Sequence, residues 1–260
     1  MTAVTETDVA RRVAVTASHR FYVHMAYACA AVAVLGFAPT YWIPLLSGRL
    51  ELAPITHLHA AFFYGWLALL IVQTRLAAAR RLMRHRELGV LGVAVATGMC
   101  FVGTGAAVNS IRQAEAAGFG DAAIAFSVVP LSGIVFFAAL FALALVNVRR
   151  LDVHKRLLLV ATISLLQAAV GRIFLLALGG DSPTLATAAP PPVFVSVIPG
   201  LVSDLLLVWA MLHDKRTLGR VHRVYWLAGA ALVVLQVIRI PIAETTVWTS
   251  IARFVMTLVP

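Results

Sequence analysis

The sequence predicts an all-α fold, a polytopic transmembrane bundle of seven helices. First, 61% of the 260 residues are hydrophobic and only 12% are charged, with a mean hydropathy of +0.92, whereas a soluble globular domain carries about 25% charged residues. Second, the apolar residues form long charge-free runs, most of them close to the ~20 residues that a helix needs to cross ~30 Å of hydrocarbon. This composition excludes an ordinary soluble enzyme.

Seven charge-free runs mark the predicted spans in order along the chain. They cover residues 21–48, 52–74, 88–111, 122–148, 157–171, 182–203 and 224–238. The first four are long enough as they stand. The last three reach the length of a span when their helices continue through Arg172, Asp204 and Arg239, so we expect these three charged residues inside the membrane.

The two ends of the chain lie outside the predicted transmembrane domain, residues 19–244. Residues 1–18 are polar and lack the apolar core and small-residue cleavage site of a signal peptide, so we expect a cytosolic N-terminal tail that stays attached. Residues 245–260 form a short apolar segment that carries Arg253, which predicts an interfacial helix on the outer surface rather than an eighth span.

The basic residues predict the orientation of the bundle. Sixteen of the 21 Lys and Arg residues lie before the first span or near the loops that join spans 2 to 3, 4 to 5 and 6 to 7. Because cytoplasmic loops carry an excess of Lys and Arg, we expect the N-terminus in the cytosol and the C-terminus outside. The same rule accounts for the net charge of +10, so the charge does not indicate a nucleic-acid partner.

An internal repeat with a period of 66 to 69 residues runs along the chain. A histidine followed by a basic residue begins each odd-numbered span, and a Ser-Val-x-Pro word recurs at 127–130 and 196–199. These recurrences predict helix 1 followed by three tandem helical hairpins. The alternative is that the histidine–basic pairs, which include His85-Arg86 and His222-Arg223, only meet lipid phosphate at the headgroup level.

Polar residues gather near the predicted outer ends of the spans. Those that we assign to a candidate binding site are His57, His59, Asn109, Arg112, Arg172 and Arg239. Placing a charge in hydrocarbon costs at least about 2.5–3.5 kcal/mol, so such groups usually face the bundle interior or a wet cavity. We therefore expect an outward-opening polar pocket whose arginines favour a carboxylate, a phosphate or a haem propionate. The alternative is that Arg172 and Arg239 form interface ion pairs with Asp181 and Glu244.

Asp204 is predicted to lie near the middle of the membrane, about 13 Å from His213 at the inner end of its span. A carboxylate at that depth is by default a functional hypothesis, so Asp204 is a candidate proton site or ligand contact. The alternative is a protonated Asp204 that donates one interhelical hydrogen bond, for example to Gln167 or Gln236.

His57 and His59 are candidate ligands of a metal ion or of haem b, because neutral imidazole binds Zn, Cu and Fe well. Residues i and i+2 of a helix point about 200° apart, so both bind one ion only where the helix begins between them. A bis-histidine haem needs a second histidine at the same depth, and the outer side offers none. The sequence contains no HExxH motif, phosphate-binding glycine loop or nucleophile elbow.

Several short words resemble those of a known group of proteins. The words are His57-Leu-His59-Ala, Gln73, His85-Arg-Glu-Leu-Gly89 and Asp152-Val-His154-Lys-Arg156. Over most of residues 52–172 they resemble a group of uncharacterised bacterial multi-pass membrane proteins, which implies an inner-membrane location and no established reaction. The placing of His beside Arg at helix ends is also loosely similar to b-type cytochrome and ferric-reductase-like helical bundles. The sequence departs from those bundles because it lacks paired mid-helix histidines.

Three interpretations of function follow from these observations. In the first, the chain is an inner-membrane protein that binds a small lipophilic or anionic molecule, or a redox cofactor such as haem or quinone, in the outer pocket; as an enzyme it would be a membrane oxidoreductase. In the second, it is a proton-coupled transporter or permease component that uses Asp204, with helix breaks at Pro130 and Pro199 that gate access. In the third, it is a non-catalytic membrane sensor or assembly factor.

Overall fold

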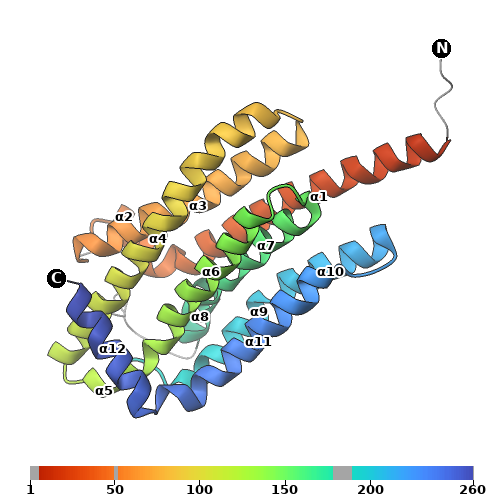
Figure 1. Cartoon of the computed structure of the whole chain (residues 1–260). Helices are drawn as coiled ribbons and strands as arrows, with labels where there is room; N and C mark the ends of the chain where they lie inside the picture. Colours follow the sequence, from red (N-terminus) through yellow and green to blue (C-terminus); the bar gives the residue numbers. More distant parts are fainter. Residues whose placement is uncertain (1–5, 50–51, 178–188, 260) are drawn as a thin grey trace.

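The computed structural model describes residues 6–49, 52–177 and 189–259, with side chains from residue 20 onward. Within these ranges the regular secondary structure is helical throughout, with no strand, and most helices run along one common direction (Figure 1). In chain order the elements are α1 Glu6–Phe37, the π-helix η1 Ala38–Trp42, α2 Ile43–Leu46, α3 Pro54–Ala78, α4 Leu82–Ala116, α5 Gly120–Phe126, α6 Val128–Val146, α7 Leu151–Leu165, α8 Gln167–Ala177, the 3-10 helix η2 Val193–Ser196, α9 Val197–Ser203, α10 Leu205–Leu218, α11 Arg223–Ala243 and α12 Thr246–Leu258.

Seven stretches of the described chain are long and apolar enough to cross a membrane. They are Arg20–Leu46, Pro54–Ala78, Leu82–Ala116, Gly120–Val146, Leu151–Ala177, Val193–Leu218 and Arg223–Ala243. The chain is therefore a multi-pass membrane protein whose helices contact lipid. As predicted, the last three spans continue through Arg172, Asp204 and Arg239.

The fifth and sixth spans extend further than their charge-free runs. The fifth helix begins at Leu151 rather than at 157, and the sixth continues to Leu218 rather than ending at 203. Both extensions contain a buried charge, Arg156 and Asp214, and the two charges neutralise each other. The predicted start of the sixth span, 182–188, lies outside the described residues.

Two helix breaks coincide with the prolines that the sequence marks as bends. Span 4 divides at Ser127 into α5 and α6, and η2 gives way to α9 after Ser196. Each break lies three residues before a proline, Pro130 or Pro199, which lacks an N–H and clashes with the carbonyl four residues back. Both serine hydroxyls donate to the carbonyl three residues earlier, at 2.6 and 2.7 Å. The two Ser-Val-x-Pro words therefore share one local structure.

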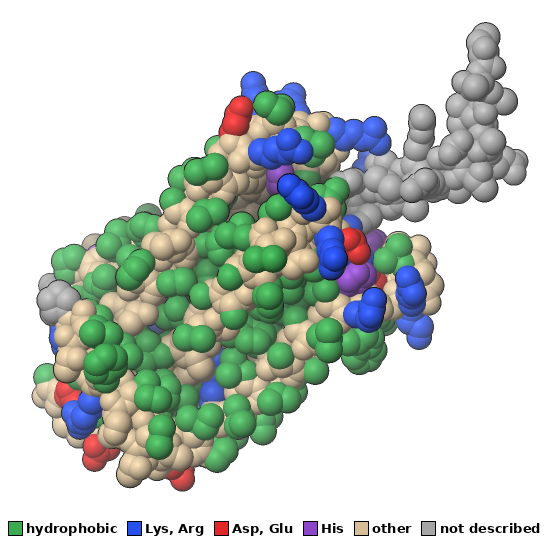
Figure 2. All heavy atoms as spheres, in the orientation of Figure 1, with side chains coloured by type: hydrophobic (Ala, Val, Ile, Leu, Met, Phe, Trp, Pro, Cys, Tyr) green, Lys and Arg blue, Asp and Glu red, His purple; other side chains and the backbone are tan. Residues whose placement is uncertain are grey.

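Neighbouring helices pack against one another around an apolar core. α3 packs on α4, α6 packs on α7, α1 contacts α3 and α8, and α11 contacts α6 and α7. The core contains Met25, Phe137, Val160 and Leu232, each at most 1% exposed. Many large apolar side chains instead point outward and cover the flank of the bundle, and most of the basic side chains in view gather towards one end (Figure 2). This distribution is that of helices whose outer surface is solvated by lipid.

The C-terminal segment forms α12, an amphipathic helix that lies beside α5 at one end of the bundle (Figure 1). Trp248 and Ala252 are buried against the neighbouring helices, and the Trp248 indole donates to the carbonyl of Ile124 at 2.9 Å. Val247 and Phe254 remain more than half exposed on another face. The predicted short helix is thus present, and it is not among the seven spans.

Candidate functional site

A cavity of about 450 Å³ lies within the bundle. Residues of all seven spans line it, and its wall reaches the exposed Ser110 near the end of α4. Its volume lies within the range of typical small-molecule sites, about 300–1,000 Å³. The structure thus contains a cavity, but its wall is mainly apolar rather than polar, and its opening to the outer side stays a prediction.

The structure divides the predicted site residues into two groups. The residues that line the cavity are His59, Asn109, Arg172 and Arg239. Those that lie outside its wall are His57, Arg112 and Asp204.

Arg239 is held in the cavity wall by neutral oxygen atoms. It is 2% exposed; its Nε donates to Ser132 Oγ at 2.7 Å, and its Nη1 donates to Gln167 Oε1 at 2.8 Å. Gln167 in turn donates to the carbonyl of Ser196 at 2.8 Å, so α6, α8 and η2 together fix the guanidinium of α11. A guanidinium has five N–H donors, so these two bonds leave donors for a ligand.

Arg172 comes from α8 and faces the π-helix η1. Its Nη1 lies 3.4 Å from Thr40 Oγ1, and its guanidinium lies 4.7 Å from the centre of the Phe37 ring. These are weak contacts for a charged group. The alternative partner Asp181 lies outside the described residues, and Arg239 pairs with Ser132 and Gln167 rather than with Glu244.

The cavity is positively charged and otherwise mainly apolar. Two arginines line it, and no described residue contributes a carboxylate to its wall. Aromatic and aliphatic side chains, among them Phe63, Phe126 and Leu175, form much of the remaining wall. Charge interactions are stronger here than in water, because the surrounding protein and lipid have a low dielectric constant. The arrangement suits a ligand with an anionic group and an apolar body.

His57 and His59 point to different partners. α3 begins at Pro54, so both lie within regular helix and the condition for a shared metal ion is not met. The ring nitrogen Nδ1 of His57 lies 3.1 Å from the hydroxyl of Tyr41. His59 stacks on Phe63 at 4.1 Å between ring centres, and its Nδ1 is buried without a hydrogen-bond partner in the described structure. The described residues contain no group of three or more His, Cys, Asp or Glu side chains that could hold a metal ion.

Arg112 binds the end of α12 instead of lining the cavity. Its Nη2 donates to the carbonyl of Met256 at 3.2 Å and to that of Val259 at 2.6 Å. The last carbonyls of a helix have no partner within the helix and attract cations. The sequence does not reveal this role, because it does not show that α12 folds back over the end of α4.

Asp204 lies at the junction of α9 and α10 and is 6% exposed. Gln236 of α11 donates to its Oδ2 at 3.0 Å. Gln236 is one of the two partners considered for Asp204, but Asp204 accepts this bond, whereas the alternative had a protonated Asp204 as the donor. Gly200 makes room for this contact, because a Cβ there would lie 2.8 Å from the Gln236 side chain. Asp204 is therefore a helix-to-helix contact outside the cavity wall.

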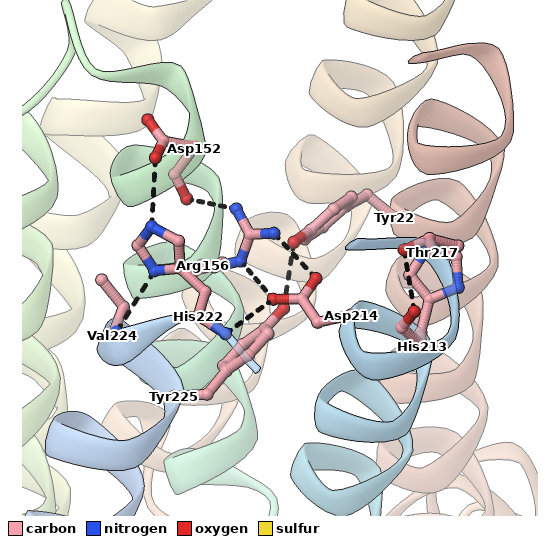
Figure 3. A network of polar contacts seen from close by, with 9 residues as sticks. All are labelled: Tyr22, Asp152, Arg156, His213, Asp214, Thr217, His222, Val224 and Tyr225. Atoms are coloured by element: carbon pink, nitrogen blue, oxygen red, sulfur yellow. Dashed lines mark hydrogen bonds and ion pairs between the residues drawn. The ribbon is translucent and has the colours of Figure 1, made fainter. Parts of the chain in front are cut away.

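A second polar cluster, which the sequence did not predict, joins α1, α7, α10 and α11 (Figure 3). We name it the ion-pair network and define it as Tyr22, Asp152, Arg156, Asp214, His222 and Tyr225. Arg156 donates to both carboxylate oxygens of Asp214, at 2.9 and 2.7 Å, and both side chains are at most 3% exposed. The hydroxyls of Tyr22 and Tyr225 lie 3.0 Å apart.

The remaining hydrogen bonds of the ion-pair network involve the backbone, except for one between the side chains of His222 and Asp152. Arg156 donates to the Asp152 carbonyl at 2.7 Å, and the His222 N–H donates to Asp214 at 3.3 Å. His222 Nδ1 accepts from the backbone of Val224, so its Nε2 is the nitrogen that donates to the Asp152 carboxylate at 3.0 Å. The available sequence signal was the pair of opposite charges Arg156 and Asp214, each a few residues inside the basic end of its span.

Comparisons with protein-family models, with curated proteins and with solved structures find no match for this chain. The class of the protein therefore rests on the fold and the cavity. It is an integral membrane protein with seven apolar spans around a ligand-sized cavity that carries two arginines.

Proposed function

We propose that this protein binds a small amphiphilic anion in the cavity. Arg172 and Arg239 hold the acidic group, and the aromatic and aliphatic wall holds the apolar part. One observation carries the proposal: both arginines line a largely apolar cavity to which no described residue contributes a carboxylate. A carboxylate or phosphate that accepts their N–H groups forms charge-assisted hydrogen bonds, which are about twice as strong as neutral ones.

Binding of a labelled fatty acid by the detergent-purified protein tests the proposal. The probe is tritiated laurate, and its uncharged partner is tritiated dodecanol. A hydrogen bond to a charged group contributes about 1.5–3 kcal/mol, so we expect Arg172→Gln to weaken laurate binding about 10- to 100-fold and to leave dodecanol binding unchanged. Arg172→Lys retains the charge and should recover part of the affinity.

The matched control is Arg253→Gln, which also removes one arginine near the same end of the molecule. Arg253 is exposed and lies 3.4 Å from Glu115, outside the cavity wall. We expect this variant to bind laurate like the unaltered protein. Equal loss of laurate and dodecanol in Arg172→Gln, or equal laurate binding by Arg172→Gln and Arg253→Gln, would contradict the proposal.

Haem b is a second candidate ligand, because the cavity also contains an imidazole. His59 lines the wall, and Arg172 and Arg239 of the same wall suit haem propionates. His59 is the one histidine among the described lining residues, so these residues supply a single axial ligand. An absorption spectrum with metal analysis decides: a Soret band that disappears in His59→Ala supports haem, and a colourless, metal-free preparation excludes haem and metal alike. A quinone, which carries no charge, would follow the dodecanol pattern.

We also infer the setting of the protein in the cell. The basic loops and the resemblance to bacterial multi-pass proteins support an inner-membrane location with the N-terminus in the cytosol and the C-terminus outside. The shared local structure at Ser127 and Ser196, and the packing of α3 on α4 and of α6 on α7, support an origin from helix 1 and tandem helical hairpins.

A further inference from the structure

The four spans that form the ion-pair network also line the cavity, together with the other three spans. The first, fifth, sixth and seventh spans each contribute to the network towards one end and line the cavity towards the other. Each of these spans contributes at least one residue to the network and at least one to the cavity wall. In span order these include Tyr22 with Thr40, Arg156 with Arg172, Asp214 with Ser196, and Tyr225 with Arg239, where the network residue is named first. Any motion that separates the network ends of these spans therefore also acts on the cavity wall.

The ion-pair network holds these four helices together. Arg156 and Asp214 join α7 to α10 by two bonds, and Tyr22 and Tyr225 join α1 to α11. The guanidinium of Arg156 also lies 5.6 Å from the centre of the Tyr225 ring. A buried pair of opposite charges has two stable arrangements, bonded to each other or separated and solvated by water, and an intermediate separation without water is costly.

In the fifth span a helix interruption lies between Arg156 of the network and Arg172 of the cavity wall. α7 gives way to α8 at Leu166, whose N–H bonds to the carbonyl three residues earlier instead of four. Residues at such junctions can absorb the changes in backbone angle that accompany the movement of one helix segment against another. Interrupted helices beside a binding site recur in transporters that expose one site to both membrane faces in turn.

We propose that the protein carries its ligand across the membrane by alternating access. The ion-pair network closes one face while the cavity is open towards the Ser110 face, and separation of Arg156 from Asp214 opens the cavity to the opposite face. Leu166 is the hinge position. The nature of the cargo rests on the proposed function, because the same cavity is the binding site in both states.

Cysteine accessibility from each membrane face tests this inference without a ligand. The background is Cys29→Ala/Cys100→Ala, which removes both native thiols. The reporter is Ser164→Cys, because Ser164 lines the cavity on α7 and is 7% exposed. Right-side-out and inverted membrane vesicles are treated with a membrane-impermeant maleimide, and the rate of labelling is compared.

The ion-pair network is then opened with Arg156→Gln/Asp214→Asn, which removes both charges and leaves no buried charge unpaired. We expect the reporter to react from the Ser110 face in the background protein. In the double variant its rate from the network face should rise at least tenfold. The matched control, Glu115→Gln/Arg253→Gln, removes an exposed ion pair and should not change the face from which the reporter is labelled.

Each outcome decides for or against the inference. A change of labelled face in the folded double variant, judged by size-exclusion chromatography, supports alternating access. Labelling from one unchanged face, from both faces at equal rates or from neither face overturns it and leaves the ion-pair network with the role of holding the helices together. The anion proposal is judged separately by laurate binding to Arg172→Gln, so either proposal can fail while the other stands.

Discussion

Arg156 and Arg239 are both 2% exposed, and they are stabilised in different ways. Arg156 is neutralised by the carboxylate of Asp214, whereas Arg239 contacts the neutral oxygens of Ser132 and Gln167. A guanidinium that keeps its charge and some of its donors remains able to bind an anion, and a neutralised one does not. The group that contacts each arginine therefore indicates its role: Arg239 is able to bind a ligand, whereas Arg156 holds two helices together.

The coupling between Arg156 and Asp214 can be measured with a double-mutant cycle. Removing one partner of a buried pair leaves an uncompensated charge and costs about 3–5 kcal/mol, so we expect Arg156→Gln and Asp214→Asn each to lower the stability of the protein strongly. The double variant should lose clearly less than the two single losses together. The free energy of unfolding is measured by denaturant titration in detergent.

The exposed pair Arg253 and Glu115 is the control for this cycle, because surface pairs contribute about 0–1 kcal/mol. Its single variants should scarcely change the unfolding free energy. Additive losses at Arg156 and Asp214 would show that the two side chains act independently and would remove the basis for treating them as one unit.

The sequence could predict part of the site at this scale and not the rest. Arg172 and Arg239 interrupt apolar runs, and a charge in hydrocarbon must turn towards protein or water, so their depth alone indicated a cavity. Arg156 lies beside the basic loop residues and was counted with them for that reason. Its partner Asp214 became evident only from the packing of α7 near α10, which no pattern in either helix specifies.

Among the elements, close helix contacts depend on residues that lack a side chain. Gly36 of α1 packs directly on α8, where a Cβ would overlap the carbonyl oxygen of Ala169. Backbone cannot yield as a flexible side chain can, so this contact fixes the distance between the two helices. The Arg172 side chain of α8 therefore stays within reach of Thr40, just beyond the end of α1.

Substitution of Gly36 tests this contact. Overpacking a tight contact typically costs about 1–3 kcal/mol, so we expect Gly36→Ala to lower the thermal unfolding temperature of the purified protein. Gly65 of α3 is the matched control, because nothing lies within 4 Å of an added Cβ there. Gly65→Ala should leave the unfolding temperature unchanged or raise it, since Ala favours helix over Gly by about 1 kcal/mol. Equal effects at both glycines would contradict the packing argument.

Element boundaries were predictable where apolar length alone decides them. All seven spans were identified from charge-free runs, and both proline-linked breaks were expected at the correct words. The break at Leu166 has no proline nearby on its C-terminal side, and the local sequence gave no reason to place it. The extensions of the fifth and sixth spans to Leu151 and Leu218 depend on charge pairing between distant helices.

For the whole molecule, the two polar clusters lie towards opposite ends of the same apolar bundle. Basic side chains concentrate in the loops near the ion-pair network, and the cavity reaches the surface near Ser110. The side on which the basic loops lie therefore also decides which compartment the cavity faces in this conformation. An orientation experiment thus bears directly on where the ligand comes from.

We predict that the loop between α3 and α4 lies in the cytosol and that the loop between α4 and α5 lies outside. The first contains Arg80 and Arg81 and is flanked by further arginines, whereas the second, around Gly118, has no basic residue. Because Lys and Arg near the ends of spans are retained in the cytosol, green fluorescent protein fused after Ala79 should fluoresce, and alkaline phosphatase fused after Gly118 should be active. Replacing Arg80, Arg81 and Arg84 by Gln should weaken this preference, because it removes much of the charge bias between the two loops. The opposite result, active phosphatase after Ala79 and fluorescent protein that fluoresces after Gly118, would show the reverse orientation. The cavity would then open to the cytosol and take its ligand from there.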